Sequence, residues 1–111
     1  MEEPVDLTNF RGMTGGDTAM EQELFREFLS SFEKGLKSLQ ENIAPTMADV
    51  WHLHAHSLRG TSLNLGAKKL GDLCKKAQND DRAPVEAKNT MLENIRAEYE
   101  QVRQFLLTIM V

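Results

Sequence analysis

The stretch HAHSLRGTSLNLGA, residues 54–67, contains the pattern that decides the fold. On a helical wheel of about 100° per residue, this stretch and the residues just before it place one stripe of mainly apolar side chains on one side of a helix. The predicted core stripe is Met47, Trp51, His54, Leu58, Thr61 and Leu65. Gly66 follows and permits the left-handed turn that closes a helix. The stretch therefore predicts an amphipathic helix that turns back sharply into the next one.

A long helix is predicted before this one, from a cap at Asp17 or Thr18, with Glu21 at capping-box spacing, to residues 42–45. Its apolar stripe comprises Leu24, Phe28, Phe32, Leu36, Leu39 and Ile43. The helix of the opening stretch is predicted to start at Thr46, with Asp49 as its capping-box partner, and to run to about residue 64.

Two more helices are predicted after Gly66. Residues 67–78 turn Leu70, Leu73, Cys74 and Ala77 inward, and Pro84 lies near the first position of the last helix. That helix carries Val85, Leu92, Ile95, Tyr99, Val102, Leu106 and Ile109 at heptad-like intervals. Near the N-terminus, residues 5–10 predict a helical turn that lays Leu7 and Phe10 on the body, and residues 12–17 predict a loop. Together these segments predict an all-α antiparallel four-helix bundle with a short N-terminal helical segment, a single domain over residues 1–111.

Composition narrows the possible partners. The chain has 111 residues, a formal charge of −4 and one cysteine. The acidic balance argues against general nucleic-acid binding, and a lone cysteine excludes an internal disulfide. The acidic N-terminus is unlike a signal peptide, and no apolar run is long enough for a membrane span. We therefore expect a cytoplasmic monomer, with nuclear shuttling open if the source is eukaryotic.

The solvent side of the helix in residues 46–64 is unusual. His56 is predicted at its centre, flanked within about 60° by His52, Leu53, Arg59, Gly60 and Leu63. Gly60 costs a helix interior about 1 kcal/mol relative to Ala, and exposed leucines are unfavourable in water. These features predict a surface for a protein partner around His56, with His52, Leu53 and Leu63 as partner-docking residues.

The next helix places polar groups beside His56. Because the turn at Gly66 is tight, Gln78 is predicted level with His56, where its amide could hold one imidazole nitrogen and leave the other free. Lys68, Lys69, Lys75 and Lys76 make this helix locally basic. A neutral imidazole is nucleophilic near neutral pH, so His56 could carry a phosphoryl group held by Arg59, with Gly60 leaving room for a partner's active site.

The motif AHSLRGTSLNLGA, residues 55–67, resembles the H-x-L-[KR]-G-x-[SA] signature of histidine-containing phosphotransfer domains. The resemblance continues through Leu70, Leu73 and Cys74 to Gln78, where a yeast phosphorelay member also has glutamine. It implies a four-helix bundle that carries phosphohistidine between receiver-domain aspartates of response regulators and hybrid histidine kinases. By this resemblance His56 is the phosphorylated residue, Arg59 the cationic neighbour and Gly60 the access position. Arg59 departs from the usual lysine but keeps the charge.

The same resemblance implies a carrier without kinase activity of its own. No nucleotide-binding motif is present, so no cofactor is expected, and the receiver partner would supply Mg²⁺. A sensor-kinase dimerisation helix pair is an alternative, but an acidic residue usually follows its histidine, whereas Ser57 follows here. The other alternative is a non-phosphorylated bundle that only docks receivers. His52 and His56 have the i, i+4 spacing of metal ligands, but no third ligand is evident, so no metal site is expected.

Overall fold

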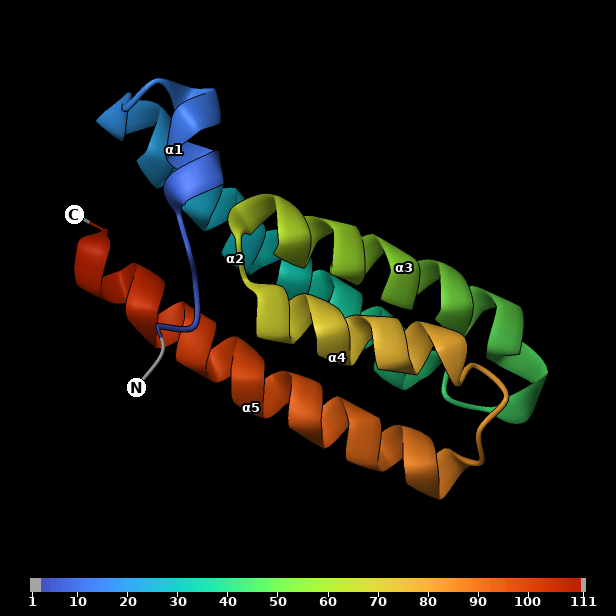
Figure 1. Cartoon of the computed structure of the whole chain (residues 1–111). Coiled ribbons are helices and arrows are strands. Elements are labelled where there is room, and N and C mark those ends of the chain that lie inside the picture. Colours follow the sequence, from blue (N-terminus) through green and yellow to red (C-terminus); the bar gives the residue numbers. More distant parts are fainter. Residues whose placement is uncertain (1–2, 111) are drawn as a thin grey trace.

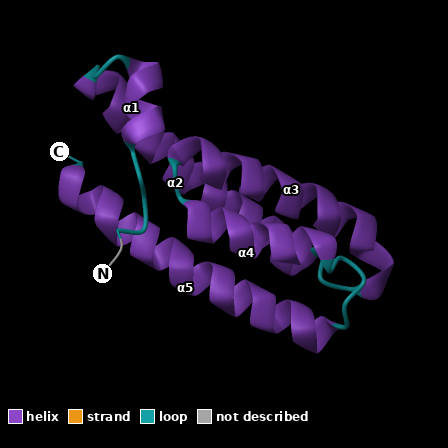
Figure 2. Cartoon of the chain, viewed as in Figure 1, coloured by secondary structure: helices purple, strands orange, loops and turns teal. Residues whose placement is uncertain are grey.

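The computed structural model describes residues 3–110, which form an elongated bundle of helices (Figures 1 and 2). Within this range there are five α-helices, one short 3₁₀ turn and no strand. The helices are α1 (Thr8–Thr14), α2 (Thr18–Glu41), α3 (Ala48–Leu65), α4 (Lys68–Asn79) and α5 (Val85–Ile109), with the 3₁₀ turn η1 (Pro45–Met47) before α3. None of the helices in residues 3–110 combines the length and apolar character that a membrane span requires.

Helices α2 to α5 form the predicted antiparallel bundle. Consecutive helices pack on one another, and α5 returns to pack on α2, so the four helices enclose one core. The short helix α1 packs on α2 and extends the bundle at one end (Figure 1). The all-α prediction and the short N-terminal helical segment are confirmed.

Aromatic side chains fill the centre of the bundle between α2 and α5. The rings of Phe32 and Tyr99 stack with centroids 4.8 Å apart, and the Tyr99 hydroxyl donates to Glu33 at 2.7 Å. Burial together with this carboxylate raises the pKa of Tyr99, which therefore stays a neutral donor. The bundle thus satisfies its one tyrosine hydroxyl while burying its ring.

The predicted stripe of α2 is wrong at its first position. Leu24 is 37% exposed, whereas Phe25 is buried and stacks on Phe10 of α1 at 5.3 Å. Because α1 packs against the start of α2, the buried side there is shifted by one residue. A similar end effect leaves Val85 exposed, since it is the first residue of α5.

Several predicted helix starts also need correction. Asp17, rather than Thr18, caps α2 by accepting from the Met20 amide at 3.0 Å, and Glu21 pairs with Arg11 of α1 instead of closing a capping box. Thr46 lies inside the 3₁₀ turn that Pro45 begins, so α3 starts at Ala48 without a side-chain cap. Residues 12–14 belong to α1 rather than to a loop. Pro84 is the N-cap of α5 and so lies next to its first residue, as predicted.

The turn between α3 and α4 depends on Gly66, as predicted. Gly66 has a φ of 98°, in the left-handed region, and its carbonyl accepts from the Asp6 amide at 2.9 Å. A Cβ at Gly66 would collide with the Asp6 carbonyl oxygen, so the N-terminal segment crosses the turn only because no side chain is there. Gly71 lets the two helices approach closely, because a Cβ there would press on the Leu63 side chain.

Cys74 is fully buried in α4, as predicted. Burial raises the pKa of its thiol to about 12, and a hydrogen bond with Ser62 only partly offsets this. The thiol is therefore protonated at neutral pH and acts as a small apolar side chain.

Candidate functional site

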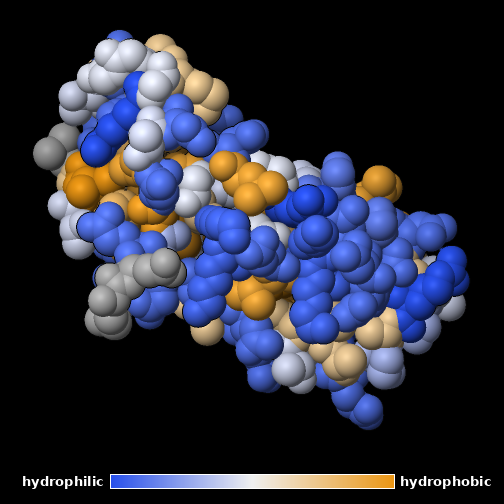
Figure 3. Space-filling view, viewed as in Figure 1, coloured by the Kyte–Doolittle hydropathy of each residue, from blue (hydrophilic) through white to orange (hydrophobic). Residues whose placement is uncertain are grey.

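The exposed side of α3 carries the residues that the sequence singled out. His56 and Gly60 are exposed, and Leu53 and Leu63 are 67% and 45% exposed. A Cβ at Gly60 would meet no atom within 4 Å, so nothing in residues 3–110 requires a glycine there. In Figure 3, small hydrophobic patches interrupt an otherwise hydrophilic surface along α3. The surface around His56 is therefore open and partly apolar.

The buried side of α3 differs in detail from the predicted stripe. Trp51, Leu58 and Leu65 are buried as predicted, but the other fully buried positions are Ala55 and Ser62. His54, Thr61 and Met47 are only partly buried. Small side chains lie here because α3 packs closely on α2 and α4. The Ser62 hydroxyl is satisfied by the Leu58 carbonyl at 2.7 Å. His56 remains on the opposite, exposed side in either description.

Gln78 of α4 lies beside His56. Nδ1 of the imidazole is 3.4 Å from the Gln78 amide oxygen Oε1. An amide oxygen only accepts, so this contact favours a proton on Nδ1 and leaves the lone pair on Nε2. In the neutral form of the ring, the nitrogen with the free lone pair is then Nε2.

His52, one turn before His56, is held by two contacts of its ring, which a residue that only docks a partner would not require. Its Nδ1 lies 3.1 Å from the Gln78 carbonyl oxygen and 2.9 Å from Asp81 Oδ2. Its side chain is nevertheless 41% exposed. Asp81 belongs to the loop between α4 and α5. The antiparallel register that brought Gln78 to His56 also places Asp81 opposite His52 and could have revealed this pair.

Cationic groups lie one turn along α3 and α4 from the imidazole. Three lysines of α4 already have carboxylate partners: Lys68 with Asp72, Lys69 with Glu98, and Lys76 with Asp80. Arg59 and Lys75 make no ion pair with any residue between 3 and 110. Arg59 follows His56 by three residues and Lys75 precedes Gln78 by three, so both lie near the imidazole's side of the helix pair.

Lys88 of α5 is a buried charged residue that no sequence pattern predicted. Its side chain is fully buried, its Nζ lies 4.8 Å from the centroid of the Trp51 ring, and no group in residues 3–110 forms a hydrogen bond with it. Burial lowers the pKa of Lys88, and the nearby charge of Asp81 partly offsets this. Trp51 and Asp81 thus connect this buried ammonium to the region around His52.

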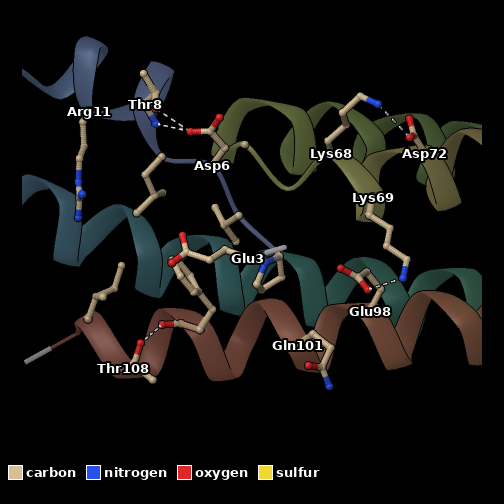
Figure 4. Close-up of a pocket in the computed structure, with 16 residues that line it drawn as sticks. Glu3, Asp6, Thr8, Arg11, Lys68, Lys69, Asp72, Glu98, Gln101 and Thr108 are labelled. Atoms are coloured by element: carbon tan, nitrogen blue, oxygen red, sulfur yellow. Dashed lines mark hydrogen bonds and ion pairs between the residues drawn. The ribbon is translucent and has the colours of Figure 1, made fainter. Parts of the chain in front are cut away.

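A groove elsewhere on the molecule does not contain the predicted site. It has a volume of about 1420 Å³ and lies between the N-terminal segment, the start of α4 and the C-terminal part of α5 (Figure 4). Two pairs of its charged groups contact one another, Lys68 with Asp72 at 3.7 Å and Lys69 with Glu98 at 3.5 Å. Within residues 3–110, no group of three or more His, Cys, Asp or Glu side chains is placed to hold a metal ion.

Comparison with known protein families gave a match. The family model described as "Hpt domain" matches residues 23–105, from the first turns of α2 to near the end of α5. The match includes the whole α3–α4 hairpin and leaves out α1 and the N-terminal segment. No curated protein and no solved structure matches the chain significantly.

Proposed function

The chain belongs to the Hpt domain family, a family of histidine phosphotransfer modules, and we propose that His56 is its phosphoryl carrier. In this proposal His56 accepts a phosphoryl group from the aspartate of one receiver domain and passes it to another. The observation that carries the proposal is the exposed imidazole of His56, whose Nδ1 faces Gln78 and whose Nε2 is left free.

The chemistry requires little from this chain beyond the imidazole. The Nε2 lone pair attacks phosphorus, the P–O bond to the receiver's aspartate breaks, and the carboxylate leaves with the electron pair. The new N–P bond makes the ring cationic until it loses a proton, and Gln78 Oε1 faces the Nδ1–H that bears this charge. Reversal of the same step delivers the phosphoryl group to the next receiver. Mg²⁺ and the acidic residues that bind it would belong to the receiver.

Arg59 and Lys75 are proposed to stabilise the phosphoryl oxygens. Since neither is engaged in an ion pair within residues 3–110, both are available to a new anion on His56. Gly60 is proposed to give the partner's active site access, because its Cα faces open space.

Arg59→Ala is expected to slow transfer from a phosphorylated receiver and to shorten the lifetime of the phosphohistidine. An exposed charge pair contributes about 0.2–1 kcal/mol, so the expected loss is about 1.4- to fivefold rather than complete. Arg59→Lys should behave nearly as wild type because it keeps the charge. Rapid-quench transfer assays and decay of the labelled protein measure both quantities. Wild-type values for Arg59→Ala would contradict the electrostatic role.

Leu53→Asp and Leu63→Asp are expected to weaken receiver binding. Both leucines are exposed on the His56 side of α3, and a buried apolar anchor can contribute more than about 1 kcal/mol to an interface. Calorimetry with a receiver domain should show at least about a fivefold rise in Kd for each variant. The far-UV helical signal is the control, particularly for Leu63, whose side chain also lies over Gly71. Unchanged affinity with an intact helical signal would remove these residues from the interface.

The direct test of the proposed function is phosphorylation by a receiver. The purified chain is mixed with a receiver domain that carries a labelled aspartyl phosphate, and the label on the chain is tested for acid lability and base stability. A phosphoramidate bond to histidine gives that behaviour. Binding of receivers without any label would instead support the interaction bundle that carries no phosphoryl group.

A further inference from the structure

The C-terminal end of α4 is held by two consecutive side chains of α3. The last carbonyls of a helix have no hydrogen-bond donor within the helix, so side chains from other elements often donate to them. Trp51 Nε1 donates to the Ala77 carbonyl at 2.8 Å, and His52 Nδ1 lies 3.1 Å from the Gln78 carbonyl. These contacts fix the end of α4, and with it Gln78, relative to α3.

Asp81 fixes the ring of His52 in turn. Its Oδ2 is 2.9 Å from the same Nδ1 that faces the Gln78 carbonyl. Because both neighbours are acceptors, Nδ1 must carry a proton, and the two contacts define the orientation of the ring. Asp81 is also the charge that partly offsets the burial of Lys88, whose ammonium lies over Trp51. The loop residue is therefore tied to α3 and α5.

Gln78 consequently lies between two histidines. Its backbone carbonyl faces His52, and its side-chain oxygen faces His56 at 3.4 Å. We propose that His52 and Asp81 are positioning residues that hold Gln78 so that its amide faces Nδ1 of His56. This inference rests on the proposed function of His56. It adds to that function the residues that determine which ring nitrogen of His56 is reactive.

If His52 and Asp81 only stabilised the fold, their removal would lower thermal stability and leave the tautomer of His56 unchanged. The His52 and Asp81 side chains are 41% and 25% exposed, and a contact between such partly exposed groups contributes little to folding. Asp81→Asn also removes the charge that partly offsets the burial of Lys88, so this variant is expected to lose some thermal stability. Removing the His52 ring should leave thermal stability nearly unchanged. What it should change is the tautomer of the His56 ring, because Nδ1 keeps its proton only while an acceptor is held opposite it.

The experiment compares His52→Ala, His52→Asn and Asp81→Asn with wild type, and uses His54→Gln as the matched control on the same helix. Asn is the rescuing variant, because its amide nitrogen is attached to Cγ, as Nδ1 is in histidine. The His56 ring nitrogens are observed by ¹⁵N NMR at about pH 8.5, well above the pKa of free imidazole. Transfer from a phosphorylated receiver is measured in parallel.

In wild type and His54→Gln the His56 ring is expected to be mainly protonated at Nδ1. In His52→Ala and Asp81→Asn it should shift towards the Nε2–H form, with transfer slowed by about three- to tenfold, as for one lost hydrogen bond. His52→Asn should restore most of both signals. In a Gln78→Ala background, His52→Ala should have no further effect, because the acceptor through which it acts is gone.

An unchanged His56 tautomer in His52→Ala and Asp81→Asn would overturn the positioning role, and so would a full additional loss in the Gln78→Ala background. The NMR result does not depend on phosphotransfer. If wild type accepts no phosphoryl group but the tautomer shifts as expected, the proposed function fails while the positioning of His56 by His52 stands.

Discussion

Replacing His56 by Gln is expected to abolish phosphoryl acceptance completely while the bundle stays folded. The imidazole supplies the only proposed nucleophile, and an amide cannot replace it. Since His56 is exposed and its one side-chain hydrogen bond within residues 3–110 is the 3.4 Å interaction with Gln78, the free energy of unfolding should change by less than about 1 kcal/mol. Labelling by a phosphorylated receiver and a thermal melt measure the two effects.

The neighbouring histidines provide matched controls for this result. His54 is half-buried on α3, and His52 is held by Asp81 and the Gln78 carbonyl. His52→Gln and His54→Gln should both still reach full labelling, although His52→Gln is expected to reach it more slowly. Label on His56→Gln, or complete loss of label from either control, would show that a different residue carries the phosphoryl group.

The fold could be predicted from sequence because long-range packing follows helical periodicity. The stripe from Phe28 to Leu39 in α2, and the apolar positions of α5 from Leu92 to Leu106, are buried as their spacing predicts. Helix starts were less predictable. Thr46 and Asp49 have capping-box spacing, but the residues before α3 form the 3₁₀ turn Pro45–Met47, which contains Thr46. Local spacing does not reveal which of two competing turn geometries prevails.

The geometry of the candidate site was predictable where one helix or the register of one hairpin determines it. The wheel placed Leu53, Gly60 and Leu63 around His56, and the tight turn at Gly66 placed Gln78 opposite it. The stripe of α3 was less accurate because Ala55 and Ser62 are small. Hydrophobicity gives them little weight, yet close helix packing selects them. Lys88 was missed because a lysine is ordinarily exposed, and only its position over Trp51 explains its burial.

Gly60 is the residue at which structure and helix propensity disagree most. Its backbone is helical, it is exposed, and a Cβ there would meet nothing within 4 Å. Neither a turn nor a close approach inside residues 3–110 therefore explains it. A glycine at such a position weakens a helix by about 0.5–1 kcal/mol relative to alanine. The access role proposed for Gly60, in which a partner comes close to His56, would account for a cost that folding alone does not explain.

Gly60→Gln is accordingly expected to be at least as stable as wild type and yet at least about tenfold slower in transfer from a receiver, which corresponds to about 1.4 kcal/mol in the barrier. Glutamine is a better helix former than glycine, so a thermal melt should show no loss of stability. Its side chain, about one turn from the imidazole, should obstruct a protein-sized partner but not a small molecule.

Phosphoramidate should therefore label Gly60→Gln as it labels wild type. With the receiver, Gly60→Ala, which adds one methyl group, should lie closer to wild type. A wild-type rate from the receiver in Gly60→Gln would rule out the access role. Loss of labelling by phosphoramidate as well would place the damage at the imidazole rather than at the docking surface.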